Sequence, residues 1–168
     1  GSQLINFNHK DDPLVWIVPI NTGSNASPVL VSNAEISSQE SAMEAVYPVR
    51  DIRFVRKPWQ DIGPTTVDNT IGELNDYFGS AVLAWIIGLI FGGQAPFELP
   101  DQVYGFTPSG GGISDPTWYD SGSGYVARGF RGTSGELTMA HEINHNLDRS
   151  SNGTWGRHIP GGCGAGGP

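Results

Sequence analysis

Residues Leu14–Ile20 have the sequence LVWIVPI, an almost wholly apolar run that ends in Asn21, Thr22 and Gly23. A short run of this kind, rich in β-branched residues and followed by turn-forming residues, is typical of a strand in the interior of a sheet, packed on both faces. We therefore predict that it forms the first core strand.

Two helices are predicted farther along the chain. Ser37 or Ser38 can cap the first helix, which Pro48 then stops. The second helix is long, because apolar residues recur at helical spacing between Ile71 and Leu89. Its regular spacing predicts a core helix.

The longest apolar run of the chain, residues 81–91, lies within this second helix. It is far shorter than the roughly 20 residues that a membrane span needs. Gly88 also interrupts it. We therefore expect a buried helix and no membrane span.

Three further strands and a last helix complete the predicted order. The last helix starts near Ser134 or Gly135, after a Gly- and Ser-rich loop at residues 108–124. This order predicts an α/β fold, in which a mixed, twisted sheet packs against two long helices and is followed by the last helix. The further strands are residues 51–57 (DIRFVRK), 102–107 (QVYGFT) and 125–130 (YVARGF).

Length and composition limit the class of protein. The 168 residues are enough for one domain with a single hydrophobic core, so we expect one domain over the whole chain. The formal net charge of −8, without a cluster of Lys or Arg, argues against a nucleic-acid partner. Only 15% of the residues are charged, whereas Gly and Ser are abundant, which favours an extracellular or cell-surface (secreted) protein.

Both ends of the sequence differ from the middle. Gly1 and Ser2 resemble the remnant of a cleaved tag, so a signal peptide ahead of them would not be seen. Residues 149–168 are rich in Gly and are predicted to form a loop segment after the last helix. The single cysteine, Cys163, lies in this segment, and we expect any disulfide partner to lie beyond this sequence.

The last helix carries an HExxH motif within the sequence TMAHEINHNLD, residues 138–148. Residues at positions i and i+4 of a helix project from the same face, one turn apart. His141 and His145 can therefore both direct an imidazole nitrogen at one ion about 2 Å away. The spacing predicts a Zn²⁺ site.

Glu142 is placed to act as a general base beside that site. Zinc lowers the pKa of a bound water to about 7, so the carboxylate need only accept one proton to release hydroxide. Leu137, Ala140, Ile143 and Leu147 are expected on the opposite, apolar side of the helix. Motif and amphipathic pattern together predict hydrolysis by a metal-activated water.

The alternative is that His141, Glu142 and His145 are ordinary polar residues of a surface helix. Three of the four histidines, however, lie in the last fifth of the chain, and the third of these is His158. The fourth, His9, lies beside charged residues near a terminus and is predicted to be a surface residue rather than a ligand.

A catalytic zinc site has three protein ligands and one open position. We predict His158 as the third ligand, because the glycines and Pro160 around it allow the chain to turn back after the helix. Asp148 is the alternative, but it suits the end of the helix, where it points along the axis and not at the ion.

These residues resemble the signature of the metzincin clan of zinc endopeptidases, HExxHxxGxxH followed later by a Met-containing turn below the metal. His141, Glu142 and His145 occupy its first three positions. Asn146 to Arg149 resembles the HNLGR segment of a secreted microbial branch of the clan. The resemblance implies a zinc-dependent endopeptidase.

The chain departs from this signature after the motif. Asp148 stands in place of the glycine, and Ser151 stands where the third histidine is expected. Residues 157–163 resemble the R-x-H-A-P-C end of the same branch, displaced by an insertion, which again makes His158 the third ligand. No methionine follows the motif, so the Met-turn that the resemblance implies either lies outside this sequence or is absent from the protein, and we expect the former.

The order of the predicted elements also resembles that of the clan: strand, helix, strand, long helix, strand, edge strand and active-site helix. In the clan, an extended substrate adds itself to the edge strand above the metal through main-chain hydrogen bonds. Residues 125–130 match that strand by order. Gly129 and Gly132 would let a substrate backbone approach closely, or they are only loop glycines.

Three functions are compatible with these patterns. The first is a zinc-dependent endopeptidase that cleaves extended protein or peptide substrates. The second is a non-catalytic, metzincin-like binding or adhesion module of a surface protein, in which the insertion has moved His158 out of reach. The third is a metal-dependent hydrolase of another carbonyl bond. Glu142→Gln separates the two hydrolases from the binding module, because only a hydrolase should lose turnover while it keeps its metal.

Overall fold

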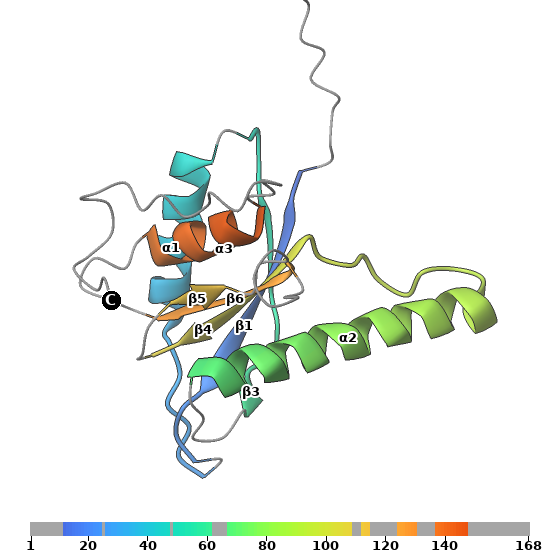
Figure 1. Cartoon of the computed structure of the whole chain (residues 1–168), viewed down its shortest axis with the longest axis horizontal. Coiled ribbons are helices and arrows are strands. Elements are labelled where there is room, and N and C mark those ends of the chain that lie inside the picture. Colours follow the sequence, from blue (N-terminus) through green and yellow to red (C-terminus); the bar gives the residue numbers. More distant parts are fainter. Residues whose placement is uncertain are drawn as a thin grey trace, which may run out of the picture.

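The computed structural model describes residues 12–24, 26–47, 49–61, 67–108, 112–114, 124–130 and 137–147, and it shows an α/β fold (Figure 1). Its centre is a parallel sheet of four strands in the order β2, β1, β4, β6. The short strand β5 pairs antiparallel with β6, and β3 pairs with the end of β1. The strands are β1 (Leu14–Asn21), β2 (Arg53–Arg56), β3 (Gln60–Asp61), β4 (Gln102–Thr107), β5 (Ile113–Ser114) and β6 (Val126–Phe130).

Strand β1 lies between two parallel neighbours and is buried along almost its whole length, as its apolar sequence predicts. The prediction of a strand at residues 102–107 is also confirmed with the same bounds. The strand predicted at residues 51–57 is shorter, because it covers Arg53–Arg56 before Pro58 separates it from β3. Proline has no N–H to donate to a ladder, which explains the break.

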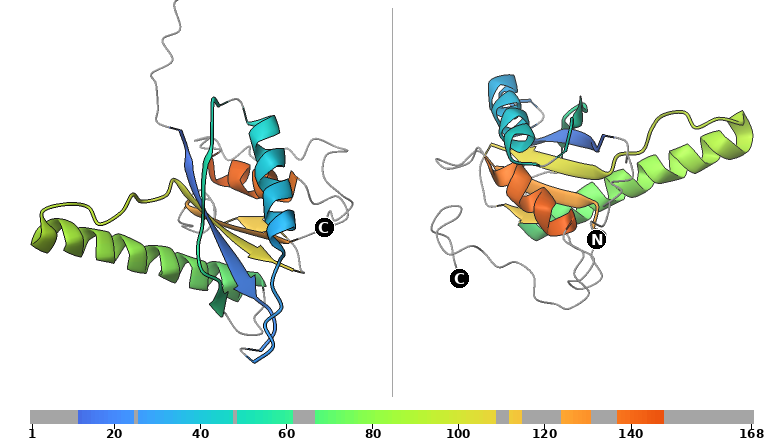
Figure 2. Two further views of the ribbon diagram at one scale, coloured as in Figure 1. Left: turned by 180° about the vertical axis from the view of Figure 1, so that it is seen from behind. Right: turned by 90° about the horizontal axis from the view of Figure 1, so that it is seen from above.

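Three described helices cover the two faces of this sheet (Figure 2). Helices α1 (Asn33–Val46) and α3 (Thr138–Leu147) lie on one face, and α2 (Val67–Gly92) lies on the other. Alternate residues of the strands divide accordingly: Tyr104 faces α1 and α3, whereas Val103 faces α2. The sheet thus has a hydrophobic core on each side.

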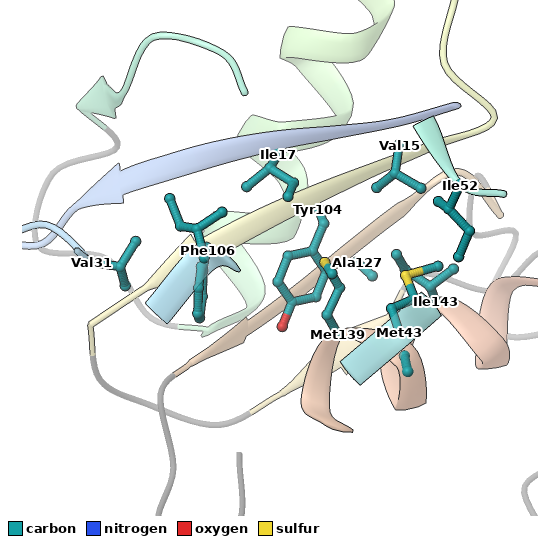
Figure 3. Packing of buried hydrophobic residues seen from close by; sticks show 12 residues of the cluster. Val15, Ile17, Val31, Met43, Ile52, Tyr104, Phe106, Ala127, Met139 and Ile143 are labelled. Carbon is teal, nitrogen blue, oxygen red and sulfur yellow. The ribbon is translucent and has the colours of Figure 1, made fainter. Parts of the chain in front are cut away.

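The core on the α1 and α3 side surrounds Tyr104, whose ring lies between the sheet and Met139 (Figure 3). Across the strands, Tyr104 is in register with Ile17 of β1 and with Ala127 of β6. Met43 of α1 is buried in the same cluster. This core therefore joins α3, the helix with the HExxH motif, directly to the sheet.

Helix α1 begins earlier than predicted. Its N-cap is Ser32, whose side chain accepts a hydrogen bond from the backbone N–H of Glu35, while the Glu35 carboxylate accepts one from the backbone N–H of Ser32. This reciprocal pair is a capping box. The cap predicted at Ser37 or Ser38 is therefore wrong, because the Ser-x-x-Glu pair that begins at Ser32 satisfies the free N–H groups instead.

Helix α2 is the long helix predicted from the apolar spacing, but it is only partly buried. Ile71 and Leu74 lie in the core on its side of the sheet, and Phe78 packs against that core. Beyond Ala81 the helix extends past the sheet (Figure 1), and the residues that follow are mostly exposed. The prediction that residues 81–91 form a buried helix is therefore wrong, because apolar spacing predicts a helix but not what lies beside it.

By length and composition, one helix among the described residues could cross a membrane. It is the segment Thr70–Gly92, of 23 residues, with a mean hydropathy of 1.5 in its most apolar window. Only 6% of that window is buried inside the protein.

Candidate functional site

The HExxH motif lies on α3, which begins at Thr138 in the described part of the chain. The start predicted near Ser134 or Gly135 lies outside the described residues. Because both histidines fall within one continuous helix, positions 141 and 145 are one turn apart on the same face. The helical backbone that the motif requires is therefore present.

The first turn of α3 is held by α1. The backbone N–H of Met139 donates a hydrogen bond of 2.9 Å to Oε1 of Gln39, which is buried. The hydroxyl of Tyr47, just after α1, donates to the carbonyl of Ala140 at 3.0 Å. A helix start has N–H groups without partners inside the helix, and Gln39 supplies an acceptor for one of them. These contacts fix the position of the turn that precedes His141.

The end of α3 is held by the sheet. The side-chain amide of Asn146 donates to Oε1 of Gln102 and to the carbonyl of Val126, each at 2.9 Å. Gln102 in turn donates to the carbonyl of Gly124 at 3.1 Å. Asn146 is buried, so these bonds are shielded from water. The segment with His141 and Glu142 is thus fixed at both ends.

Glu142 is nearly buried, with 8% of its surface exposed. Its carboxylate lies against Gly112, because a Cβ atom added to that glycine would be 2.9 Å from Cδ of Glu142 and in closer contact with its Oε1. Gly112 immediately precedes the edge strand β5. Burial raises the pKa of Glu142 to about 7. A carboxyl group with this pKa can exchange protons at neutral pH.

The amphipathic pattern predicted for α3 is confirmed only in part. Ala140 and Ile143 are buried as predicted, but Leu137 is largely exposed, and the side chain of Leu147 is not described. Glu142 was expected on the polar side that faces a cleft, whereas it lies between the helix and the segment before β5. Spacing on one helix does not reveal which segment covers it.

Of the predicted metal ligands, only the side chain of His141 lies among those that the structure describes. His141 is half-buried on the accessible side of α3, next to the exposed Asn144. The side chain of His145 is not described, and His158 and Asp148 lie outside the described residues, so the choice between them stays a prediction. Among the residues that were described, no three His, Cys, Asp or Glu side chains are grouped as a metal site.

The residues of α3 nevertheless fit a zinc ion by their chemistry. Zn²⁺ favours imidazole ligands, and positions 141 and 145 present two of them one turn apart. The nearly buried carboxylate of Glu142 lies on the same helix without taking either ligand position.

The strand predicted as the substrate-binding edge is an interior strand. β6 pairs with β4 on one side and with β5 on the other, so within the described residues β5 forms this edge of the sheet and β2 forms the opposite edge. Gly129 in β6 is buried, and a Cβ atom there would overlap the hydroxyl of Tyr104. Gly129 therefore permits close packing between sheet and helix, not the approach of a substrate. Gly132 lies outside the described residues.

Tyr104 is a buried titratable group close to Glu142. Its burial, reinforced by the negative charge of Glu142, raises the pKa of the Tyr104 hydroxyl well above its ordinary value, and the positive charge of Arg128 acts in the opposite direction. The hydroxyl makes no hydrogen bond to any residue that the structure describes. Tyr104 is therefore neutral at physiological pH.

Three residues that support the site were missed by the sequence analysis: Gln39, Gly112 and Asn146. Gln39 lies 100 positions from its partner in the sequence, and nothing in the local pattern around it indicates a contact with α3. Of the three, only Asn146 has a signal in the sequence. It is a polar residue on the side of α3 opposite His141, which is the side predicted to be apolar.

Comparisons with known protein families, with curated proteins and with solved structures find no match to this chain. The functional assignment therefore depends on the geometry of α3 and its surroundings.

Proposed function

We propose that this protein is a zinc-dependent endopeptidase of metzincin type. His141, His145 and His158 would hold the ion, and Glu142 would serve as the general base. The observation that carries the proposal is the position of Glu142: its carboxylate lies beside Gly112, directly before the edge strand of the sheet. The general base and the strand edge that would hold an extended substrate are thus adjacent.

The edge strand supports a peptide as the substrate. β5 pairs antiparallel with β6 through one of its sides, and no described strand pairs with its other side. An extended chain can add to such an edge through main-chain hydrogen bonds, which do not depend on side-chain identity. In this arrangement the scissile bond would lie over α3, near His141 and Glu142. The substrate strand is therefore assigned to β5, not to residues 125–130.

The division of tasks follows from the chemistry of the residues. When bound, a zinc ion supplies Lewis acidity that makes water a nucleophile at neutral pH. Glu142 accepts the proton that the attacking water loses and passes a proton to the amine that leaves. The hydrogen bonds of Met139 to Gln39 and of Asn146 to Gln102 keep the carboxylate in position while this happens. A secreted setting, favoured by the low share of charged residues, belongs to the same proposal.

Metal content is the first test. We expect about one zinc ion per chain after dialysis against metal-free buffer, and a sharp loss of zinc in His141→Ala and in His158→Ala. His9→Ala is the matched control, because His9 is predicted not to be a ligand, and it should keep its zinc. Zinc retained in His158→Ala would point to Asp148 or water as the third ligand. No zinc in any protein, even after zinc is added back, would refute the proposal.

Glu142→Gln tests the reaction itself. The substitution keeps the size of the side chain but removes its basicity, so we expect bound zinc to be unchanged while cleavage of a quenched fluorescent peptide falls by at least a hundredfold. If the unchanged protein binds zinc but cleaves no peptide, that result would favour the binding module. Cleavage of esters alone would favour the third function, hydrolysis of another carbonyl bond.

A further inference from the structure

The second half of α2 is an apolar helix that stands clear of the sheet. Figures 1 and 2 show it extending away from the other elements, and its exposed fraction reaches 68% at Ile90 and 84% at Phe91. Large apolar side chains clustered on a surface, unlike single ones, mark a site of interaction. The first half of the same helix packs in the core through Ile71 and Leu74.

This protrusion carries no charge. In the sequence, no Asp, Glu, Lys or Arg occurs between Asp76 and Glu98. The uncharged stretch includes the chain that returns from the helix end, where the ring of Pro96 lies so close to Gly88 that a Cβ atom on the glycine would collide with it. Helix and returning chain therefore form one uncharged unit. A partner held by charge pairs does not suit such a surface.

The exposed apolar side chains also surround much of the helix. At 3.6 residues per turn they spread over roughly 200° of its circumference. A helix that packs on one neighbour has an apolar stripe of about 100°, whereas a wider apolar surface is typical of a helix immersed in an apolar phase. The breadth therefore favours lipid over a single protein partner. The residues are Leu83, Ile86, Ile87, Leu89, Ile90 and Phe91.

Two ordinary explanations of an apolar helix do not apply. A core helix would be buried, whereas only 6% of the most apolar window of α2 lies inside the protein. A signal sequence lies near the start of a chain, whereas α2 begins at Val67 and packs on a folded sheet. The free part, residues 82–92, is roughly 16 Å long, about half the thickness of the hydrocarbon of a bilayer. It can enter one leaflet but cannot cross the membrane.

We propose that residues 82–92 of α2 insert into the hydrocarbon of a lipid membrane and attach the protein to its surface. The net charge of −8 repels anionic headgroups, so the surface that fits is a neutral one, such as phosphatidylcholine. Apolar burial alone then supplies the attraction. This inference does not depend on the proposed peptidase activity, because none of its residues belongs to α3 or β5.

Vesicle flotation with the full chain tests the inference. We expect the protein to float with phosphatidylcholine vesicles, and the bound fraction to fall at least tenfold in the double variant Ile90→Asp with Phe91→Asp. The matched control is Val29→Asp with Val46→Asp, which changes two apolar residues outside α2 that are each about half exposed and adds the same charge. It should float like the unchanged protein. An uncharged pair, Ile90→Asn with Phe91→Asn, should also lose binding, which separates lost apolar surface from added charge.

Several outcomes would overturn the inference. One is that the unchanged protein fails to float with phosphatidylcholine; another is that the Ile90 and Phe91 variants float as well as it does. Binding that requires phosphatidylglycerol and disappears at high salt would be electrostatic and not apolar. Sedimentation velocity tests whether a second copy of the chain covers the helix instead. That would be the result if the unchanged protein is a dimer that does not bind vesicles, and if the Ile90 and Phe91 variants are monomers.

Discussion

The side-chain amide nitrogen of Asn146 lies 2.9 Å from Oε1 of Gln102 and donates a hydrogen bond to it, which joins the end of α3 to strand β4. The same amide also donates to the carbonyl of Val126 in β6. One buried side chain thus connects the helix of the candidate site with two neighbouring strands. Its removal should affect both the stability of the fold and the position of the site.

Asn146→Ala is expected to lower the free energy of unfolding by about 2 kcal/mol, because it leaves buried acceptors on Gln102 and Val126 without their donor. Urea denaturation measures this change. Asn144→Ala is the control, since Asn144 is exposed on the same helix and its removal should cost less than about 0.5 kcal/mol. Equal stability of the two variants would show that the bonds of Asn146 do not hold α3.

Gln39→Met is expected to cost about 1 to 2 kcal/mol. The substitution keeps most of the buried volume but removes the acceptor for the N–H of Met139 at the start of α3. The matched control is Ser38→Met on the exposed side of α1, which should be nearly neutral. If thermal unfolding of Gln39→Met matches that of the unchanged protein, the start of α3 is held by other contacts.

Gly112→Ala is expected to reduce kcat/KM for a peptide by tenfold or more. A methyl group there would collide with the Glu142 carboxylate, so either the carboxylate or the start of β5 must shift, and small displacements of a catalytic group are costly. Zinc content should not change. Gly72→Ala is the control, because a Cβ atom at that helical position meets nothing. An unchanged kcat/KM in Gly112→Ala would show that Gly112 does not determine the position of the Glu142 carboxylate.

Gly129→Ala is expected to destabilise the protein by about 2 kcal/mol, because the new methyl group would overlap the Tyr104 hydroxyl and lie 2.8 Å from Cγ2 of Thr138. Tyr104→Phe removes that hydroxyl, so the double variant should recover about 1 kcal/mol in a double-mutant cycle. Tyr104→Phe alone should be close to neutral, because the hydroxyl has no hydrogen-bond partner among the described residues. Strictly additive effects would contradict this packing.

The strands and helices of this protein follow largely from local patterns. The apolar run at Leu14–Ile20 predicts the strand β1, because a strand buried on both faces requires such residues, and the strand predicted at residues 102–107 is also present. The one-turn spacing of His141 and His145 places both on one face of α3, since that spacing is a property of the helix itself. Neither conclusion depends on the rest of the chain.

Tertiary structure decided the features that involve two distant segments. Whether residues 81–91 are buried depends on how far the sheet extends beneath α2, and the apolar sequence is the same in either case. That β5 and not β6 forms the described edge depends on strand order, which no single strand encodes. Likewise, Gln39 and Asn146 hold α3 through partners 100 and 44 positions away in the sequence. Periodicity records which side of an element is apolar, whereas only packing in three dimensions determines what that side contacts.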